Sequence, residues 1–147
     1  MTDHRKLDRL LDLRRHEEQR RAAELAMARG ALIDASEAVS KLTSQRAELE
    51  ALVSEGGAGS IGQVKTTRLL IEQVDQGLRN ARTVLALAEA AVAEKLESLE
   101  KAHQNCEALE RIIAPRHAQA RALERMADQK AQDEIAAHRF RRGGKAS

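Results

Sequence analysis

The sequence predicts an all-α fold, an antiparallel two-helix coiled-coil hairpin whose second helix overhangs the first. Three observations predict this fold. Apolar residues recur at alternating steps of three and four over two long stretches, which is the spacing of a coiled-coil seam. One glycine cluster, at residues 56–60, separates the two stretches. The 147-residue chain has one Phe, no Trp and no Tyr, and 33% of its residues are charged, so it lacks the aromatic side chains that carry much of a globular core.

The first stretch predicts a helix over about residues 3–54. Its seam positions are Leu25, Ala28, Leu32, Ala35, Val39, Leu42, Arg46, Leu49 and Val53. Carried toward the N-terminus, the same steps continue through Arg21, Glu18, Arg14, Leu11 and Leu7. The predicted seam is therefore polar from residue 14 to residue 21 and apolar again at the end of the chain.

The cluster Gly56-Gly57-Ala58-Gly59-Ser60 predicts a turn at about residues 55–60, because glycine is a strong breaker of regular structure. The second stretch predicts a helix over about residues 61–142, which Gly143-Gly144 should end, followed by a basic tail over 143–147. Its seam positions are Ile71, Val74, Leu78, Ala81, Leu85, Ala88, Val92, Lys95, Leu99, Ala102, Cys106, Leu109 and Ile113.

Pro115 lies inside the second predicted helix. Proline removes a backbone hydrogen bond and costs about 3 kcal/mol in a helix interior. We expect a kink or a weakened turn at residues 111–115, and a full break that gives a third helix is the alternative. A single coiled-coil domain over residues 1–147 accounts for the whole chain.

The polar seam positions predict how the two helices pair. In an antiparallel hairpin, the sequence numbers of any two residues that face each other add up to the same value. This sum defines the register, and 113 and 120 are the two candidates. A sum of 113 places Glu18 opposite Lys95 and Arg46 opposite Thr67, whereas 120 sets both cations against apolar residues, which is unfavourable. We therefore predict a sum of 113, with everything after about residue 111 overhanging the first helix.

No pattern in the sequence indicates catalysis. The five histidines show no ligand spacing with Cys106, the only cysteine, so no metal site is predicted. The glycine cluster lacks the Lys-Ser/Thr ending and the preceding strand of a phosphate-binding loop. We expect no catalytic residue, no cofactor and no small-molecule ligand.

Charge and hydropathy predict a cytoplasmic protein. The formal net charge is +2, so nothing in the whole-chain balance requires nucleic acid or an anionic membrane. No stretch approaches the roughly 20 apolar residues of a membrane span. The first eight residues lack the apolar run of a signal peptide, and a single cysteine fits a reducing compartment.

Two polar features have two interpretations each. The run from His138 to Lys145 carries four formal positive charges and no acid. It either complements the helix dipole and improves solubility, or binds an acidic partner or a nucleic-acid backbone. The polar seam residues either fix the register or loosen the hairpin where other proteins contact it.

One segment of the chain resembles a family signature. The segment Arg125–Arg139 resembles the C-terminal signature of the FliJ proteins of the bacterial flagellar export apparatus. The segment Ala35–Leu42 is similar to the first helix of that family as it approaches its turn. Chains of the family have about this length, a Gly-containing loop near the middle and a basic tail, so the resemblance covers nearly the whole sequence.

The resemblance implies a stalk-like coiled coil of the flagellar type III export apparatus, at the inner membrane, that serves motility and chemotaxis. Such a stalk binds and stimulates the hexameric export ATPase and contacts the cytoplasmic domain of the export gate protein or export chaperones. The signature residues at the implied ATPase-facing end are Arg125, Asp128, Lys130, Asp133, Glu134 and Arg139. The tip-proximal residues at the implied gate-facing end are Leu42, Leu49, Leu70 and Val74. Well-known members carry aromatic residues near the tip, and this chain has none there.

Three other functions are alternatives. One is the equivalent stalk of a virulence type III secretion system, and another is a dimeric scaffold whose heptads pair between chains. The third is a nucleic-acid-binding coiled coil, which the interspersed Asp and Glu disfavour because a phosphate-reading surface is continuously basic. We therefore expect no nucleic-acid partner.

Overall fold

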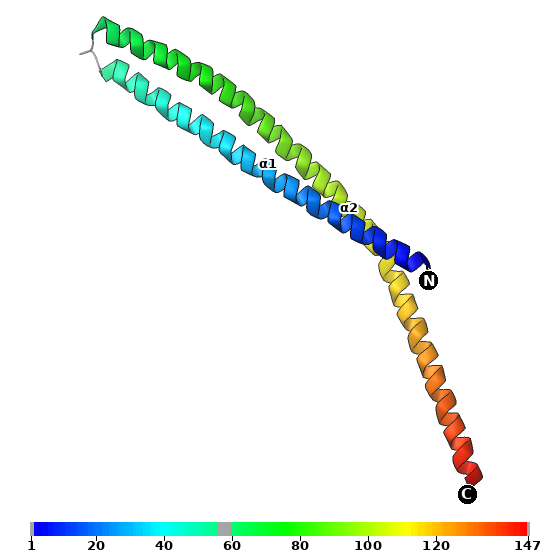
Figure 1. Ribbon diagram of the computed structural model, residues 1–147. Coiled ribbons are helices and arrows are strands. Elements are labelled where there is room, and N and C mark those ends of the chain that lie inside the picture. Colours follow the sequence, from blue (N-terminus) through cyan, green and yellow to red (C-terminus); the bar gives the residue numbers. More distant parts are fainter. Residues whose placement is uncertain (1, 56–59, 147) are drawn as a thin grey trace. The chain divides into compact units, whose positions relative to one another are not determined.

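The computed structural model describes residues 2–55 and 60–146, and the centre of the predicted turn, at Gly56-Gly57, lies outside them. The described residues form two helices, α1 (Thr2–Glu55) and α2 (Ile61–Ala146), and contain no strand. The two helices pack against each other as an all-α helical hairpin (Figure 1). The predicted fold class is confirmed.

A capping box starts α2. Ser60 Oγ accepts a hydrogen bond from the Gln63 backbone N–H (3.2 Å), and Gln63 Oε1 accepts one from the Ser60 backbone N–H (3.3 Å). These reciprocal bonds satisfy backbone donors that the first helical turn would otherwise leave without partners. The Ser-x-x-Gln spacing therefore encodes the start of α2 more sharply than the glycine cluster before it.

The C-terminal end of α2 lies further along the chain than the sequence predicts. The helix continues through Gly143-Gly144 to Ala146 instead of ending near Arg142, so residues 143–146 of the predicted basic tail are helical. Glycine lowers helix stability by about 1 kcal/mol relative to alanine, but it does not forbid helical dihedral angles. Ser147 lies outside the described residues.

Helix α2 is also continuous through Pro115, so the alternative of a third helix is wrong. Two features of proline explain this. Its ring fixes φ near the value of a helix, and its exposed position lets water reach the carbonyl group that loses its N–H partner. The kink at residues 111–115 stays a prediction.

The chain divides into two compact units, and each contains parts of both helices. The first unit combines the N-terminal residues up to His16 with the residues from His103 onward. The second unit spans Glu17–Ala102.

In the second unit, burial follows the predicted seam. Leu25, Ala35 and Leu78 are 4%, 6% and 3% exposed. Most of the other seam residues are half-buried, including Leu32, Val39, Leu85 and Val92. A contact between two helices covers one stripe of each helix, so most side chains of the seam stay partly exposed to solvent.

The helices of the second unit pair in a register with a sum near 120, and the predicted sum of 113 is wrong. Lys95 Nζ lies 3.6 Å from Glu24 Oε2. Arg46 Nε lies 2.5 Å from Asp75 Oδ1. These cross-helix pairs have sums of 119 and 121, so Lys95 and Arg46 do not meet the residues predicted to face them.

Acids beside the seam explain why the register of 120 is stable. In this register Lys95 faces Leu25 and Arg46 faces Val74. When only the seam residues are considered, a cation opposite an apolar residue makes the register unfavourable. Each of these apolar residues has an acid next to it in the chain, Glu24 and Asp75, and both acids pair with the cations. Long cationic side chains pack their stems on apolar surface and extend their heads sideways. The cations are therefore partnered without facing an acid directly.

The first unit has its own small core. Leu11, Leu109 and Ile113 form a buried cluster, 7%, 8% and 5% exposed, and Leu7 packs against it. Cys106 is also buried in this unit, at 3% exposed. These residues continue the heptad steps of both helices, as predicted for the N-terminal end of the seam.

Two polar pairs mark where α1 stops covering α2 in the first unit. Arg15 Nη2 lies 3.4 Å from Glu110 Oε1, and His117 Nε2 lies 2.9 Å from Asp8 Oδ1. Residues 121–143 are all exposed, and Figure 1 shows this part of α2 extending past the start of α1. The overhang therefore begins at residue 121 and not after residue 111. The register, which was predicted one heptad out, accounts for most of this difference.

The core of the first unit can be tested by truncating Ile113. Ile113→Ala should destabilise the pairing of α1 with α2 there by about 2–4 kcal/mol, because a buried side chain is lost and a cavity remains. Native-state hydrogen exchange at backbone amides 5–16 measures this loss. Ile112→Ala is the matched control, since Ile112 is 51% exposed, and it should stay within about 0.5 kcal/mol of wild type. Equal losses in the two variants would contradict the burial of Ile113 in the contact between α1 and α2.

Candidate partner-binding surfaces

The described residues offer helix surfaces and no metal cluster. Over residues 2–55 and 60–146, no group of three or more His, Cys, Asp or Glu side chains is placed to hold a metal ion. In the same part of the chain, neither helix contains an apolar stretch that could cross a membrane. The candidate sites are therefore exposed faces of α1 and α2.

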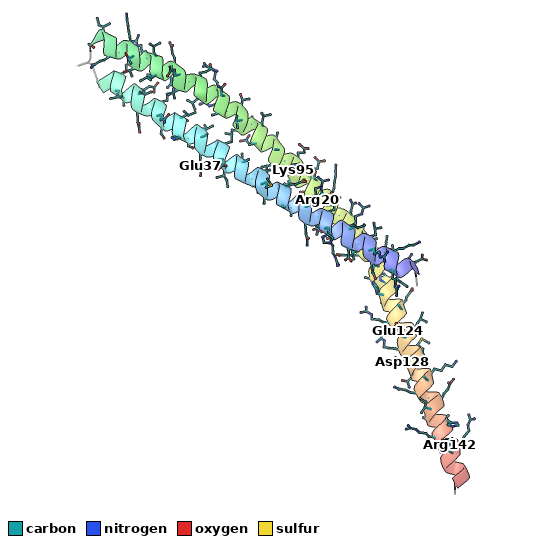
Figure 2. All side chains as sticks on the ribbon, in the orientation of Figure 1. Arg20, Glu37, Lys95, Glu124, Asp128 and Arg142 are labelled. Atoms are coloured by element: carbon teal, nitrogen blue, oxygen red, sulfur yellow. The ribbon has the colours of Figure 1, made fainter. Side chains whose placement is uncertain are left out.

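The six signature residues lie on the overhanging part of α2, residues 121–143, which we call the C-terminal segment. Every residue of this segment is exposed. In Figure 2, side chains project from the segment around Glu124, Asp128 and Arg142. The structure therefore places all six residues where another molecule can reach them, and their roles stay predictions.

The helical period divides the six signature residues between two faces of the C-terminal segment. One face carries Arg125, Asp128 and Arg139, and the opposite face carries Lys130, Asp133 and Glu134. Two contacts here run along the helix. Gln129 Nε2 donates a hydrogen bond to Asp133 Oδ1 (3.3 Å), and Arg125 Nε donates one to the Arg121 carbonyl (3.4 Å). The residues are exposed together but do not converge on one point.

The four tip-proximal residues lie in the second unit and are less available. Leu42, Leu49 and Val74 are half-buried seam residues. Leu42 packs over Gly77, where an added Cβ would lie 3.6 Å from Leu42 Cδ1. Leu70, beside the seam, is 43% exposed. Most of these four side chains therefore contribute to the hairpin itself, and Leu70 offers the most surface.

The second unit also contains a polar groove of about 430 Å³ that sequence reasoning missed. Arg46 lies in it and bonds to Asp75 on α2 and to Glu50 on α1. The hydrogen bond to Asp75 first, and the charge of that carboxylate next, raise the pKa of the Arg46 guanidinium. Arg79 and Arg82 line the same groove. The sequence signal that could have revealed this groove was Asp75, the acid that follows the seam residue Val74.

A second ionic cluster spans the two helices of this unit near Lys95, which Figure 2 labels on α2. Arg21 lies 2.9 Å from Glu17 and 3.2 Å from Glu24, and Lys95 lies 3.6 Å from Glu24. The hydrogen bond from Arg21 lowers the pKa of the Glu24 carboxyl, and the charge of Lys95 also lowers it, against an opposing effect of burial. These contacts agree with the interpretation that polar seam residues fix the register.

Two histidines come together in the first unit. The rings of His4 and His117 stack with centroids 5.9 Å apart and planes at 27°, and His117 also contacts Asp8. No spacing rule could find this group, because His4 and His117 lie 113 residues apart in the sequence. Their contact depends on the register of the hairpin.

Two long helices joined along a heptad seam, with an exposed charged segment beyond the seam, define a coiled-coil hairpin protein. A family comparison makes the assignment more specific. The model of the flagellar FliJ protein family matches residues 3–145, and the chain belongs to this family. It is accordingly a coiled-coil protein associated with flagellar export. No curated protein and no solved structure gives a match.

The ionic cluster around Glu24 predicts a pH dependence. Because the pKa of Glu24 is lowered in the folded state, its carboxylate stabilises the hairpin above the unfolded-state pKa of about 4.3, and that contribution is lost as pH falls through the folded-state pKa. Glu24→Gln should therefore show a smaller fall in Tm than wild type between about pH 6 and about pH 3. Circular dichroism during heating measures this difference.

Glu48→Gln is the control for this experiment, since Glu48 is an exposed glutamate on the same helix. This variant should keep the acid-induced fall in Tm of the wild-type chain. A fall in Glu24→Gln as large as that in Glu48→Gln would mean that the cluster does not stabilise the hairpin.

Proposed function

We propose that this protein is a non-enzymatic, cytoplasmic stalk that binds and stimulates the hexameric flagellar export ATPase at the inner membrane. The observation that carries the proposal is the match of the FliJ family model to residues 3–145. The match is to a flagellar family, which favours the flagellar apparatus over a virulence secretion system. Export of flagellar subunits would connect the protein with motility and chemotaxis.

The C-terminal segment is the proposed ATPase-binding element. It is exposed on all sides, and its two charged faces can contact different subunits of a ring. Such contacts change the nucleotide state of a subunit only if they are stronger in one state than in another, because equal affinity shifts no equilibrium. The mixture of Arg, Lys, Asp and Glu along the segment allows such unequal contacts.

The tip-proximal part of the second unit is the proposed contact for the cytoplasmic domain of the export gate protein, or for export chaperones. Leu70 supports this assignment, because a leucine that is 43% exposed beside the seam can be covered by a partner. Leu42, Leu49 and Val74 would act mainly by supporting the shape of this surface.

Truncation after Ala120 tests the ATPase assignment. The cut removes the C-terminal segment and keeps the contacts of Ile113 and His117 with α1, so the shortened chain should keep a helical circular dichroism spectrum and a Tm close to wild type. Stimulation of ATP hydrolysis by the hexameric export ATPase should be lost. Stimulation as strong as that of the full chain would refute the assignment of this segment.

A charge reversal inside the segment gives a sharper test. Arg125→Glu should raise the concentration needed for half-maximal stimulation about tenfold, which corresponds to about 1.4 kcal/mol. Arg68→Glu is the matched control, because Arg68 is an exposed arginine in the second unit. It should behave as wild type, and equal effects of the two reversals would point to net charge as the cause.

A further inference from the structure

Over residues 61–93, α2 carries all its charges on one side. With the seam residues at heptad positions a and d, the charged residues of this stretch fall only at positions b and e. They are Lys65, Arg68, Glu72, Asp75, Arg79, Arg82 and Glu89. Positions c, f and g hold Gly, Gln, Thr, Leu, Asn, Val and Ala, and no charge. A helix that faced only water there would be expected to carry charges on that outer side as well.

This uncharged face, defined as positions c, f and g of residues 61–93, is exposed except at Gly77 and Ala91, which are half-buried, and it contains large apolar side chains. Leu69, Leu70, Val84 and Leu87 are 60%, 43%, 55% and 67% exposed. α1 packs along the neighbouring a and d positions and leaves these side chains uncovered. Apolar groups gathered on one face in this way mark a contact with another molecule.

The charges along the edge of this face favour a second copy of the same chain. Glu72 and Arg79 both lie at position b, next to the uncharged face, and have opposite signs. Two α2 helices placed antiparallel about a two-fold axis between residues 75 and 76 bring Glu72 of each copy opposite Arg79 of the other. A two-fold axis repeats every contact, so the interface contains this ion pair twice.

The same arrangement places Thr66 of one copy beside Val84 of the other. A partner of strong net charge would gain little on this face, whereas an identical face is uncharged along its centre and complementary at its edge.

We propose that the uncharged face of α2 binds a second copy of this chain, giving an antiparallel α2–α2 dimer in which each hairpin keeps its own seam. The dimer differs from a scaffold made by exchanging heptads between chains, because α1 stays paired with its own α2. It requires no part of the C-terminal segment and is independent of the proposed ATPase contact. Leu70 belongs to both the uncharged face and the proposed gate contact, so the dimer and the gate protein would compete for this side chain.

Sedimentation velocity of the full chain between about 1 and about 100 µM tests the proposal. The wild-type chain should shift from monomer to dimer mass with concentration. Glu72→Arg and Arg79→Glu should each weaken dimerisation at least about tenfold, because each places like charges opposite one another. The double variant Glu72→Arg/Arg79→Glu restores opposite charges and should recover dimerisation to within about threefold of wild type.

Two further variants complete the design. Glu89→Arg makes the same change of charge as Glu72→Arg, but at heptad position e, which is not next to the uncharged face. This variant should dimerise as wild type. Leu87→Gln keeps all charges, removes an exposed apolar side chain and should weaken the dimer. Circular dichroism checks that each variant is folded. A wild-type chain that stays monomeric throughout, or a dimer unchanged by the single reversals or not recovered by the double variant, would overturn the proposal.

Discussion

A contact between two helices covers one stripe of each, and any cation within that stripe needs an acid within reach. This constraint determines the packing of the second unit. Lys95 pairs with Glu24, and Arg46 pairs with Asp75, and in both pairs the acid lies beside the seam. Apolar residues along the stripe supply the attraction between the helices, but they are too uniform to select one alignment. The charged residues select it.

The sequence was sufficient for the helices and the seam, because both depend on local spacing. The steps of three and four identified residues such as Leu25, Leu78 and Ile113, which the structure buries. The register was not predictable by the same means. Alignments one heptad apart place apolar residues against apolar residues equally well, so a decision based on seam residues alone had no information about Asp75. Most of the misplacement of the start of the overhang followed from this error.

The candidate surfaces were predictable to different degrees. Beyond Ala120 the heptad steps reach Leu123 and Ala127, and then Lys130 and Glu134. The loss of the apolar pattern therefore indicates the exposure of the C-terminal segment only from about residue 130, whereas the structure exposes it from residue 121. The tip-proximal residues were harder. The heptad steps place Leu42 on the seam and Leu70 beside it, but only the structure shows that Leu42 packs over Gly77 and that Leu70 is 43% exposed. The contact of His4 with His117 depends on tertiary structure alone.

The burial of the single thiol in the first unit has a practical consequence. Cys106 is 3% exposed, and reaction with a thiol reagent requires access of the reagent to the sulfur. Separation of α1 from α2 in this unit would provide that access. The native chain thus contains its own chemical reporter of how often this end of the hairpin opens, without any introduced label.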